Sequence, residues 1–309
     1  MTNSPATAAP SELAFGLVRA PFGDCVDDAF FFPSDQHLRA LEFMGHLLWT
    51  RARLGVVTAN HGCGKSLLIS RLRRDLDERI VAAAVSKENI GPREFLLEVL
   101  RQYGFSLDDN DKTDRRRLLE RFLHHQASMG RICLLVVENA QSMHPSVLEE
   151  LRCLAAVEVD GTRILKVLMV GQPALNHVLE SPRMAELLAL SVPRFSLSPL
   201  SEDQAAAYVA HRLRAAGATD PDALMAHTLM PQIYSYTAGV PVQINRLCER
   251  ALAWASEEGA SQVTNSALER AVVELQLHER VPPSILRLDP RQESKPATAE
   301  DARLSVVMQ

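Results

Sequence analysis

Residues 59–66 read Ala-Asn-His-Gly-Cys-Gly-Lys-Ser. They match the pattern G-x-x-x-x-G-K-[ST], except that alanine, which is nearly as small as glycine, holds the first position. A short apolar run at 54–58 precedes them, and apolar residues with helical spacing follow from 65 to 76. A strand, a glycine loop and a helix in this order are the context that gives the pattern structural meaning, and they argue against a chance match. We therefore predict a phosphate-binding loop at this turn.

Each fixed position of the pattern has a chemical role in such a loop. Gly62 and Gly64 let the backbone curl, so that successive N–H groups point at phosphate oxygens. The helix that begins near Lys65 adds its positive dipole end, Lys65 reaches the terminal phosphates, and the Ser66 hydroxyl ligates magnesium. We predict that the chain binds ATP with Mg²⁺ through Ala59, Asn60, His61, Gly62, Cys63, Gly64, Lys65, Ser66 and Leu67.

An acidic residue follows the most apolar stretch of the chain. The run Ile-Cys-Leu-Leu-Val-Val at 132–137 predicts a buried strand, and Glu138 and Asn139 come directly after it. Glu138 is the expected second magnesium ligand beside Ser66. The usual pair at this place is Asp then Glu, in which the Glu activates the attacking water. Asn139 can orient a water but has no carboxylate to accept its proton, so we expect slow hydrolysis unless Glu138 acts as the base itself.

The rest of the first two thirds alternates between strand and helix patterns. Further strands are expected at 80–85, 164–170 and 195–197, and helices at 35–51, 92–103, 114–126 and after Pro145. This alternation predicts a parallel sheet covered on both faces, and the apolar strands suit a sheet buried on both sides. From Ser201, which forms a capping box with Gln204, only helices are expected.

The predicted fold is therefore α/β: a P-loop NTPase αβα sandwich with a central parallel sheet, followed by a small all-helical lid subdomain. We expect four parts, namely a flexible arm at 1–20, the nucleotide-binding domain at 21–198, the lid at 199–278 and a disordered tail at 279–309.

Composition limits the possible partners and compartments. The chain has 309 residues, 47% hydrophobic and 23% charged, which is typical of a soluble globular protein. A net charge of -5 gives no global attraction for nucleic acid. Arginines cluster at 71–74 and 115–117, where acidic neighbours favour a solvated helix face over a nucleic-acid patch.

The five cysteines are scattered and form no CxxC pair, so they indicate neither a zinc site nor a disulfide framework. The first residues lack the features of a secretory signal, and no apolar run approaches the ~20 residues of a membrane span. We expect a cytoplasmic protein without a membrane span, which could still dock on a membrane protein.

Several motifs in order resemble one known family. They are PFGDCVDDAFFFPS at 21–34 with His37 and Ala40-Leu41 after it, the phosphate loop, VVENAQSM at 136–143, VLMVGQP at 167–173, FSLSPLS at 195–201 and GVPVQINRLCERAL at 239–252. Together they resemble the bacterial AAA+ ATPases of the ExeA (GspA) type, found in secretion and pilus assembly. These are similar to the TniB-type ATPases that regulate transposition. The resemblance runs from about residue 21 to 275.

The resemblance implies an ATP-binding αβα domain with a helical lid, a protein partner and often a homo-oligomer. It places the aromatic strap at 30–32 near the adenine, whereas the residues alone leave packing on the core as an equal alternative. It also implies that Gln172 senses the γ-phosphate, the alternative being an ordinary polar residue at a strand end.

Two further positions depart from the family pattern. Residues 187–190 read Leu-Leu-Ala-Leu where the family carries arginines that reach a neighbour's ATP, and 239–242 read Gly-Val-Pro-Val where it ends in a sensor arginine. We expect a nucleotide-gated regulator or assembly factor with weak hydrolysis. The alternatives are a working ATPase, with Glu138 as base and Arg194 or Arg246 in trans, for secretion, pilus assembly or transposition, and a structural protein with a vestigial site.

Overall fold

The computed structural model describes residues 15–23, 27–109, 113–159, 162–181, 184 and 192–278. Most of the predicted N-terminal arm, the predicted tail at 279–309 and the leucine-rich stretch at 187–190 lie outside the described residues.

The central sheet has five strands in the order β2-β3-β6-β1-β7, and every neighbouring pair is parallel. The predicted αβα class is confirmed, and each strand lies within two residues of its expected place. The bounds are β1 Leu54–Ala59, β2 Ile80–Val85, β3 Ile132–Val137, β6 Leu165–Gly171 and β7 Arg194–Leu197.

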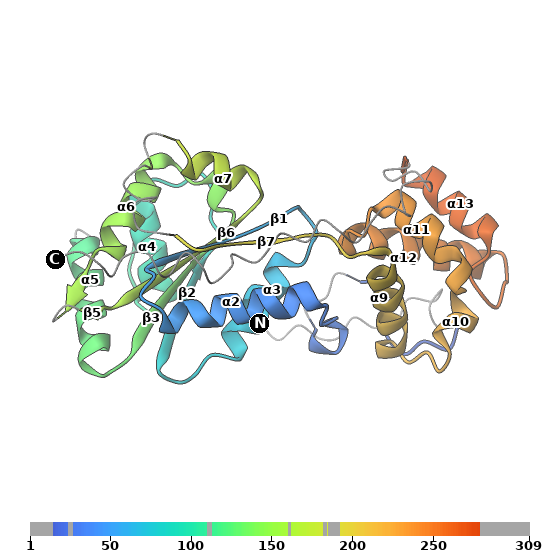
Figure 1. The fold of residues 1–309 in the computed structure, drawn as a ribbon, viewed down its shortest axis with the longest axis horizontal. Helices are drawn as coiled ribbons and strands as arrows, with labels where there is room; N and C mark the ends of the chain where they lie inside the picture. The colour runs from blue at the N-terminus through green and yellow to red at the C-terminus, as the bar shows by residue number, and fades with distance from the viewer. Residues whose placement is uncertain are drawn as a thin grey trace, which may run out of the picture.

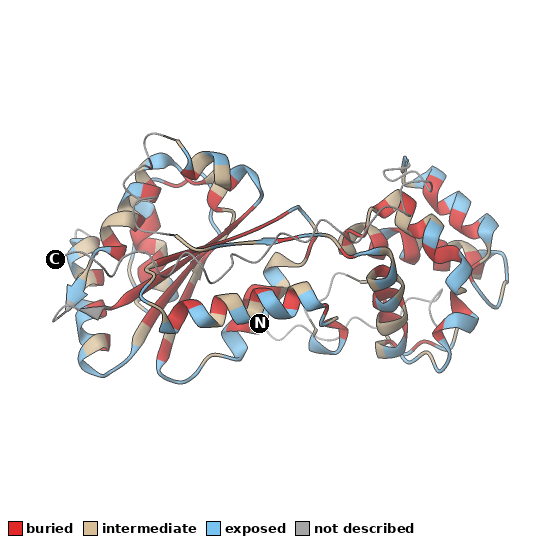
Figure 2. Ribbon diagram, in the orientation of Figure 1, coloured by how far each residue is buried: buried red, intermediate tan, exposed pale blue. Residues whose placement is uncertain are grey.

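Helices cover both faces of this sheet, and its three central strands β1, β3 and β6 are almost wholly buried (Figures 1 and 2). One face packs against α4, α5, α6 and α7, and the other against α2 and α3. Buried apolar side chains on both faces explain why strands such as β3 read as unbroken apolar runs. The helices are α2 Asp35–Trp49, α3 Lys65–Arg74, α4 Pro92–Gln102, α5 Arg115–Ser128, α6 Pro145–Ala155 and α7 Ala174–Leu179.

A helical bundle with its own core follows β7 and lies at the other end of the molecule (Figure 1). The capping box of Ser201 with Gln204 is present at its first helix. The bundle consists of α9 Glu202–Ala215, α10 Pro221–Leu224, α11 Met230–Thr237, α12 Pro241–Glu257 and α13 Asn265–Glu274. Smaller elements are η1 Asp28–Phe30, η2 Ala140–Ser142, η4 His227–Leu229 and the hairpin of β4 Glu158–Val159 with β5 Thr162–Arg163.

Most of the segment before α2 packs on the helical bundle, whereas its Asp28 and Phe31 contact arginines of α3. We call residues 15–23 and 27–34 the strap; its Phe22 and Phe30 are buried in the bundle core. The buried Arg212 of α9 donates hydrogen bonds to the carbonyls of Pro21 and Gly23, and its guanidinium lies 4.6 Å from the Phe30 ring centre. The strap therefore fastens to α9 before the chain enters α2 and the sheet domain.

The hold of Arg212 on the strap can be tested by substitution. We expect Arg212→Ala to lower the thermal midpoint by several degrees, because hydrogen bonds from a charged donor contribute about 1.5–3 kcal/mol each and two carbonyls lose theirs. Hydrogen exchange of the strap amides should also accelerate. The neighbouring Arg214→Ala, at an exposed position of the same helix, is the control. Equal exchange of the strap in both variants would contradict the assignment.

Candidate nucleotide-binding site

The phosphate loop turns the chain from β1 into α3 within a few residues. Gly62 (φ 81°) and Gly64 (φ 90°) both adopt the left-handed conformation that other residues avoid. Gly64 is the N-cap of α3, and no side chain caps this helix. The first N–H groups of α3 are therefore left for an acceptor outside the helix, which is the property that binds anions at helix N-termini.

Lys65 lies folded over this loop. Its Nζ donates hydrogen bonds to the carbonyls of Ala59 and Asn60, each at 2.9 Å. Burial lowers the pKa of Lys65, and the nearby Cys63 acts in the opposite direction. The ammonium group is thus held by two neutral carbonyls, and an anionic phosphate would be a stronger partner for it.

The two predicted magnesium ligands lie around one cavity. Ser66 and Glu138 line a cavity of about 390 Å³ together with Arg73 and other residues of α3. The backbone N–H of Glu138 donates to the Val85 carbonyl at 2.8 Å, which fixes the residue just beyond β3. Burial raises the pKa of the Glu138 carboxyl, while Arg73 lowers it. A hydroxyl and a carboxylate fit Mg²⁺, which takes few protein oxygens and completes its shell with phosphates and water.

The backbone conformation at position 139 favours asparagine. Asn139 begins η2 with φ 50°, a left-handed conformation that asparagine tolerates better than most residues. A glutamate at this position would carry conformational strain as well as its carboxylate. The sequence pattern gave no sign of this constraint.

Gln172 follows β6, and β6 lies between β1 and β3 in the sheet. Its side chain is exposed at the strand end, between the phosphate loop and Glu138 in strand order. Its backbone N–H donates to Oε1 of Gln141 at 2.9 Å. A Cβ on Gly171 would lie 2.5 Å from the same oxygen, so Gly171 permits this approach. Sequence reasoning missed Gln141, whose only signal was its place in the motif after β3.

The helical bundle touches the phosphate loop directly through the start of α12. The backbone N–H of Val242 donates to the Gly62 carbonyl at 3.2 Å. A Cβ on Gly62 would lie 2.1 Å from Cγ1 of Val242 and 3.2 Å from Cγ1 of Val240. An apolar contact therefore covers the loop at the place where a sensor arginine was expected from the family pattern.

The two remaining arginines have different surroundings. Arg194, on β7, binds Asn176 and Glu180 at 3.2 Å each, so it has partners within its own chain. Arg246 is exposed on α12, one turn beyond Val242.

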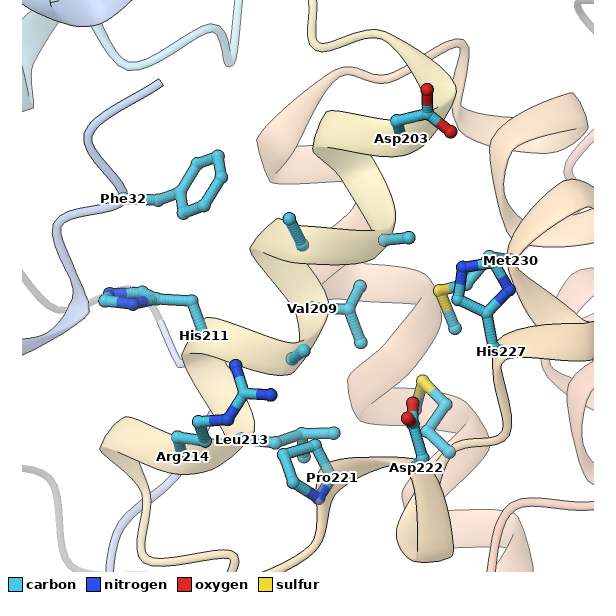
Figure 3. Close-up of a pocket in the computed structure, with 14 residues that line it drawn as sticks. Phe32, Asp203, Val209, His211, Leu213, Arg214, Pro221, Asp222, His227 and Met230 are labelled. Carbon is cyan, nitrogen blue, oxygen red and sulfur yellow. The ribbon is translucent and has the colours of Figure 1, made fainter. Parts of the chain in front are cut away.

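A second cavity, of about 480 Å³, lies in the helical bundle between α9 and α10 (Figure 3). Phe32 of the strap faces it from one side, and His211 and Arg214 come from α9. None of the residues that line it belongs to the phosphate loop. This cavity is therefore separate from the predicted phosphate loop.

Comparisons with known proteins support the fold class of this chain. The model of a family described as AAA domain matches residues 49–179. General secretion pathway protein A of Aeromonas hydrophila is 26% identical over 264 residues, which cover 84% of this chain and 48% of that protein. This chain resembles the bacterial AAA+ ATPases of the ExeA type, and both matches support that resemblance. It spans about half the length of the curated relative that it matches.

Solved structures with the same fold belong to other AAA+ proteins. The ORC2 protein of Aeropyrum pernix, in ADPNP-ADP complexes, is 14% identical with a TM-score of 0.62, over 81% of this chain and 70% of that one. Cdc6p of Pyrobaculum aerophilum is 18% identical with a TM-score of 0.59, over 80% and 71%. At these identities the likeness concerns the fold. Among the described residues of this AAA+ protein, no helix has both the length and the apolar character that crossing a membrane requires.

The raised pKa of Glu138 makes a prediction about stability. A carboxyl whose pKa is higher in the folded state makes the protein less stable as pH rises from the unfolded value, near 4.5, through the folded one. Glu138→Gln removes the buried charge, so we expect a higher thermal midpoint than wild type at pH 7 and a smaller difference at pH 4.

Glu149→Gln is the matched control for this measurement. Glu149 is exposed, and hydrogen bonds from Arg152 lower the pKa of its carboxyl. The sign is therefore reversed, and at pH 7 this variant should be no more stable than wild type. If Glu138→Gln does not raise the thermal midpoint at pH 7, burial of the charged Glu138 carboxylate does not destabilise the protein.

Proposed function

We propose that this AAA+ protein binds ATP with Mg²⁺ and acts as a nucleotide-gated regulator or assembly factor with weak hydrolysis. The contact of Val242 with Gly62 carries the proposal. It joins the helical lid to the loop that would hold the phosphates. A ligand that enters the loop changes the surroundings of this contact, and it shifts the lid to the extent that it binds one lid position better than another.

In this proposal each predicted residue keeps its task. The amides of residues 59–67 and the Lys65 ammonium bind the phosphates. Ser66 and Glu138 hold Mg²⁺, which would neutralise phosphate charge. Gln172 would sense the terminal phosphate from the end of β6.

Weak hydrolysis follows from what replaces the usual catalytic groups. Asn139 has no carboxylate to take a proton from water. Val242 stands where the lid would offer an arginine, and Arg194 is engaged with Glu180. Because an arginine supplied to the transferred phosphate is worth about 10³–10⁵ in rate, its loss alone leaves a slow enzyme.

The second candidate is a working ATPase. It is favoured by the burial that raises the pKa of Glu138, since a carboxylate of higher pKa is a better general base. An arginine would then have to come from a neighbouring copy in a homo-oligomer. The name of the curated relative favours a partner in secretion, with pilus assembly and transposition as the other pathways. The cytoplasmic location of the present chain remains a prediction from its sequence.

Calorimetry and turnover assays distinguish these functions. We expect wild type to bind ATP in the presence of Mg²⁺ and to turn it over well below ~1 s⁻¹, the lower end for typical enzymes. Lys65→Ala should weaken binding at least tenfold, since it removes a charged phosphate contact of about 1.5–3 kcal/mol. Turnover at ordinary enzyme rates that Lys65→Ala abolishes would favour the working ATPase, and absent ATP binding would favour a vestigial site.

Asn139→Asp tests the missing base. Aspartate also tolerates the left-handed backbone, so the variant adds a carboxylate with little strain. We expect turnover to rise by about tenfold or more, given that a general base contributes about 10²–10⁴. Asn89→Asp is the control, because Asn89 is exposed and has a similar φ of 55°. If neither variant, or both equally, changes the rate, Asn139 does not limit hydrolysis.

Hydrogen exchange tests gating separately from chemistry. Adding ATP with Mg²⁺ should change the protection of amides at the start of α12 in wild type and leave them unchanged in Lys65→Ala. ATP binding in calorimetry without any change at α12 would refute gating and leave binding intact.

A further inference from the structure

His37 is a buried histidine that joins the strap to the phosphate loop. It lies in the first turn of α2 and is 6% exposed. Its Nδ1 is 2.6 Å from the Ser34 hydroxyl, and its Nε2 is 3.2 Å from the Cys63 carbonyl. The resemblance motif included His37, but the function described above gives it no task.

The contacts of the ring fix its proton. A carbonyl oxygen only accepts, so Nε2 carries the hydrogen that it donates to Cys63, and Nδ1 accepts from the Ser34 hydroxyl. Ser34 Oγ in turn accepts from the His37 backbone N–H at 3.4 Å, which leaves its hydrogen free for Nδ1. Burial lowers the pKa of His37 and so favours this neutral ring, although the bond to Cys63 acts in the opposite direction.

The hydrogen bond from His37 to the Cys63 carbonyl determines the direction of the Gly64 N–H. The peptide unit is planar and trans, so the Cys63 C=O and the Gly64 N–H point in opposite directions. When the carbonyl faces His37, the Gly64 N–H faces away from it. Gly62 and Gly64 flank Cys63, and glycines permit more backbone conformations than other residues do. A hydrogen bond from outside the loop therefore restricts this peptide to one of the orientations that the glycines permit.

We propose that His37 is a positioning residue for the phosphate loop, which holds the Cys63–Gly64 peptide so that the Gly64 N–H is directed at a phosphate group of the nucleotide. This inference rests on the proposed ATP binding.

The contact of His37 with Ser34 also connects the loop to the lid. Phe32 of the strap, two residues before Ser34, packs on the Tyr208 and His211 rings of α9. The strap and α12 thus give the lid two separate connections to the same loop.

Two substitutions separate the hold on the loop from the other contacts of the ring. His37→Gln keeps an N–H donor near the place of Nε2, whereas His37→Asn places its amide near Nδ1, beside Ser34, and does not reach Cys63. We expect ATP affinity to fall about tenfold in His37→Asn, as for one lost hydrogen bond to a charged group, and to stay within about threefold of wild type in His37→Gln. Affinity for adenosine, which has no phosphate, should be the same in both variants and wild type.

Met44→Ala is the control for general destabilisation. Met44 is a buried residue of α2 that packs under the same face of the sheet. This variant should lose thermal stability but keep its ATP affinity. The positioning role is overturned if His37→Asn binds ATP like wild type, or if His37→Asn and Met44→Ala lose affinity equally.

The NMR signal of the Gly64 amide in the nucleotide-free protein provides a test that does not need binding. Both His37 variants lose the ring current of the imidazole beside Gly64, so the signal should shift further in His37→Asn than in His37→Gln and remain near its wild-type position in Met44→Ala. If wild type does not bind ATP, the proposed function fails, and this measurement still decides whether His37 orients the peptide. A Gly64 amide that shifts no further in His37→Asn than in His37→Gln would overturn the inference.

Discussion

The rest of the site depends on a short turn whose backbone amides lack partners in the helix that they begin. Between Ala59 and Lys65 the chain leaves a buried parallel strand and enters α3, and two left-handed glycines make this possible. The N–H groups at the start of α3 need an acceptor, and burying them unpaired would be costly. A phosphate group would satisfy several of them at once, which is why we propose a nucleotide site at this turn.

Parallel topology brings the remaining groups to this turn. Because all five strands run in one direction, the residues that follow β1, β6 and β3 lie along one edge of the sheet. The loop, Gln172 and Glu138 therefore come together although they are far apart in sequence. Gln141 fixes the arrangement by bridging the ends of β3 and β6. The lid places two valine side chains against Gly62 of the loop. An apolar contact can exclude water but cannot stabilise charge on a transferred phosphate.

Much of this could be predicted because the evidence was local in the sequence. The loop pattern, the apolar run of β3 and the capping box at Ser201 each occupy a few consecutive residues, and each lies where it was expected. The contacts of His37 with Cys63 and of Val242 with Gly62 could not be predicted, because they join residues whose proximity depends on the finished fold. The left-handed conformation of Asn139 could not be predicted from the sequence either, since asparagine is common both in turns and in polar sites.

Two lid connections to one loop have an energetic consequence. Val242 bonds to Gly62 from α12. His37, in the first turn of α2, bonds to Cys63 and follows a strap that is fastened to α9, so adjacent peptide groups of the loop are both connected to the same bundle. A nucleotide that reorients either peptide must alter both the loop and its attachment to the lid. To move such an equilibrium from 1:99 to 99:1, it must bind one arrangement about 10⁴-fold better than the other, or about 5.5 kcal/mol. A triphosphate, with several charged hydrogen bonds of about 1.5–3 kcal/mol each, can supply this difference without being hydrolysed. Binding and release alone could therefore drive the lid, and the replacement of catalytic groups at Asn139 and Val242 is compatible with a working switch.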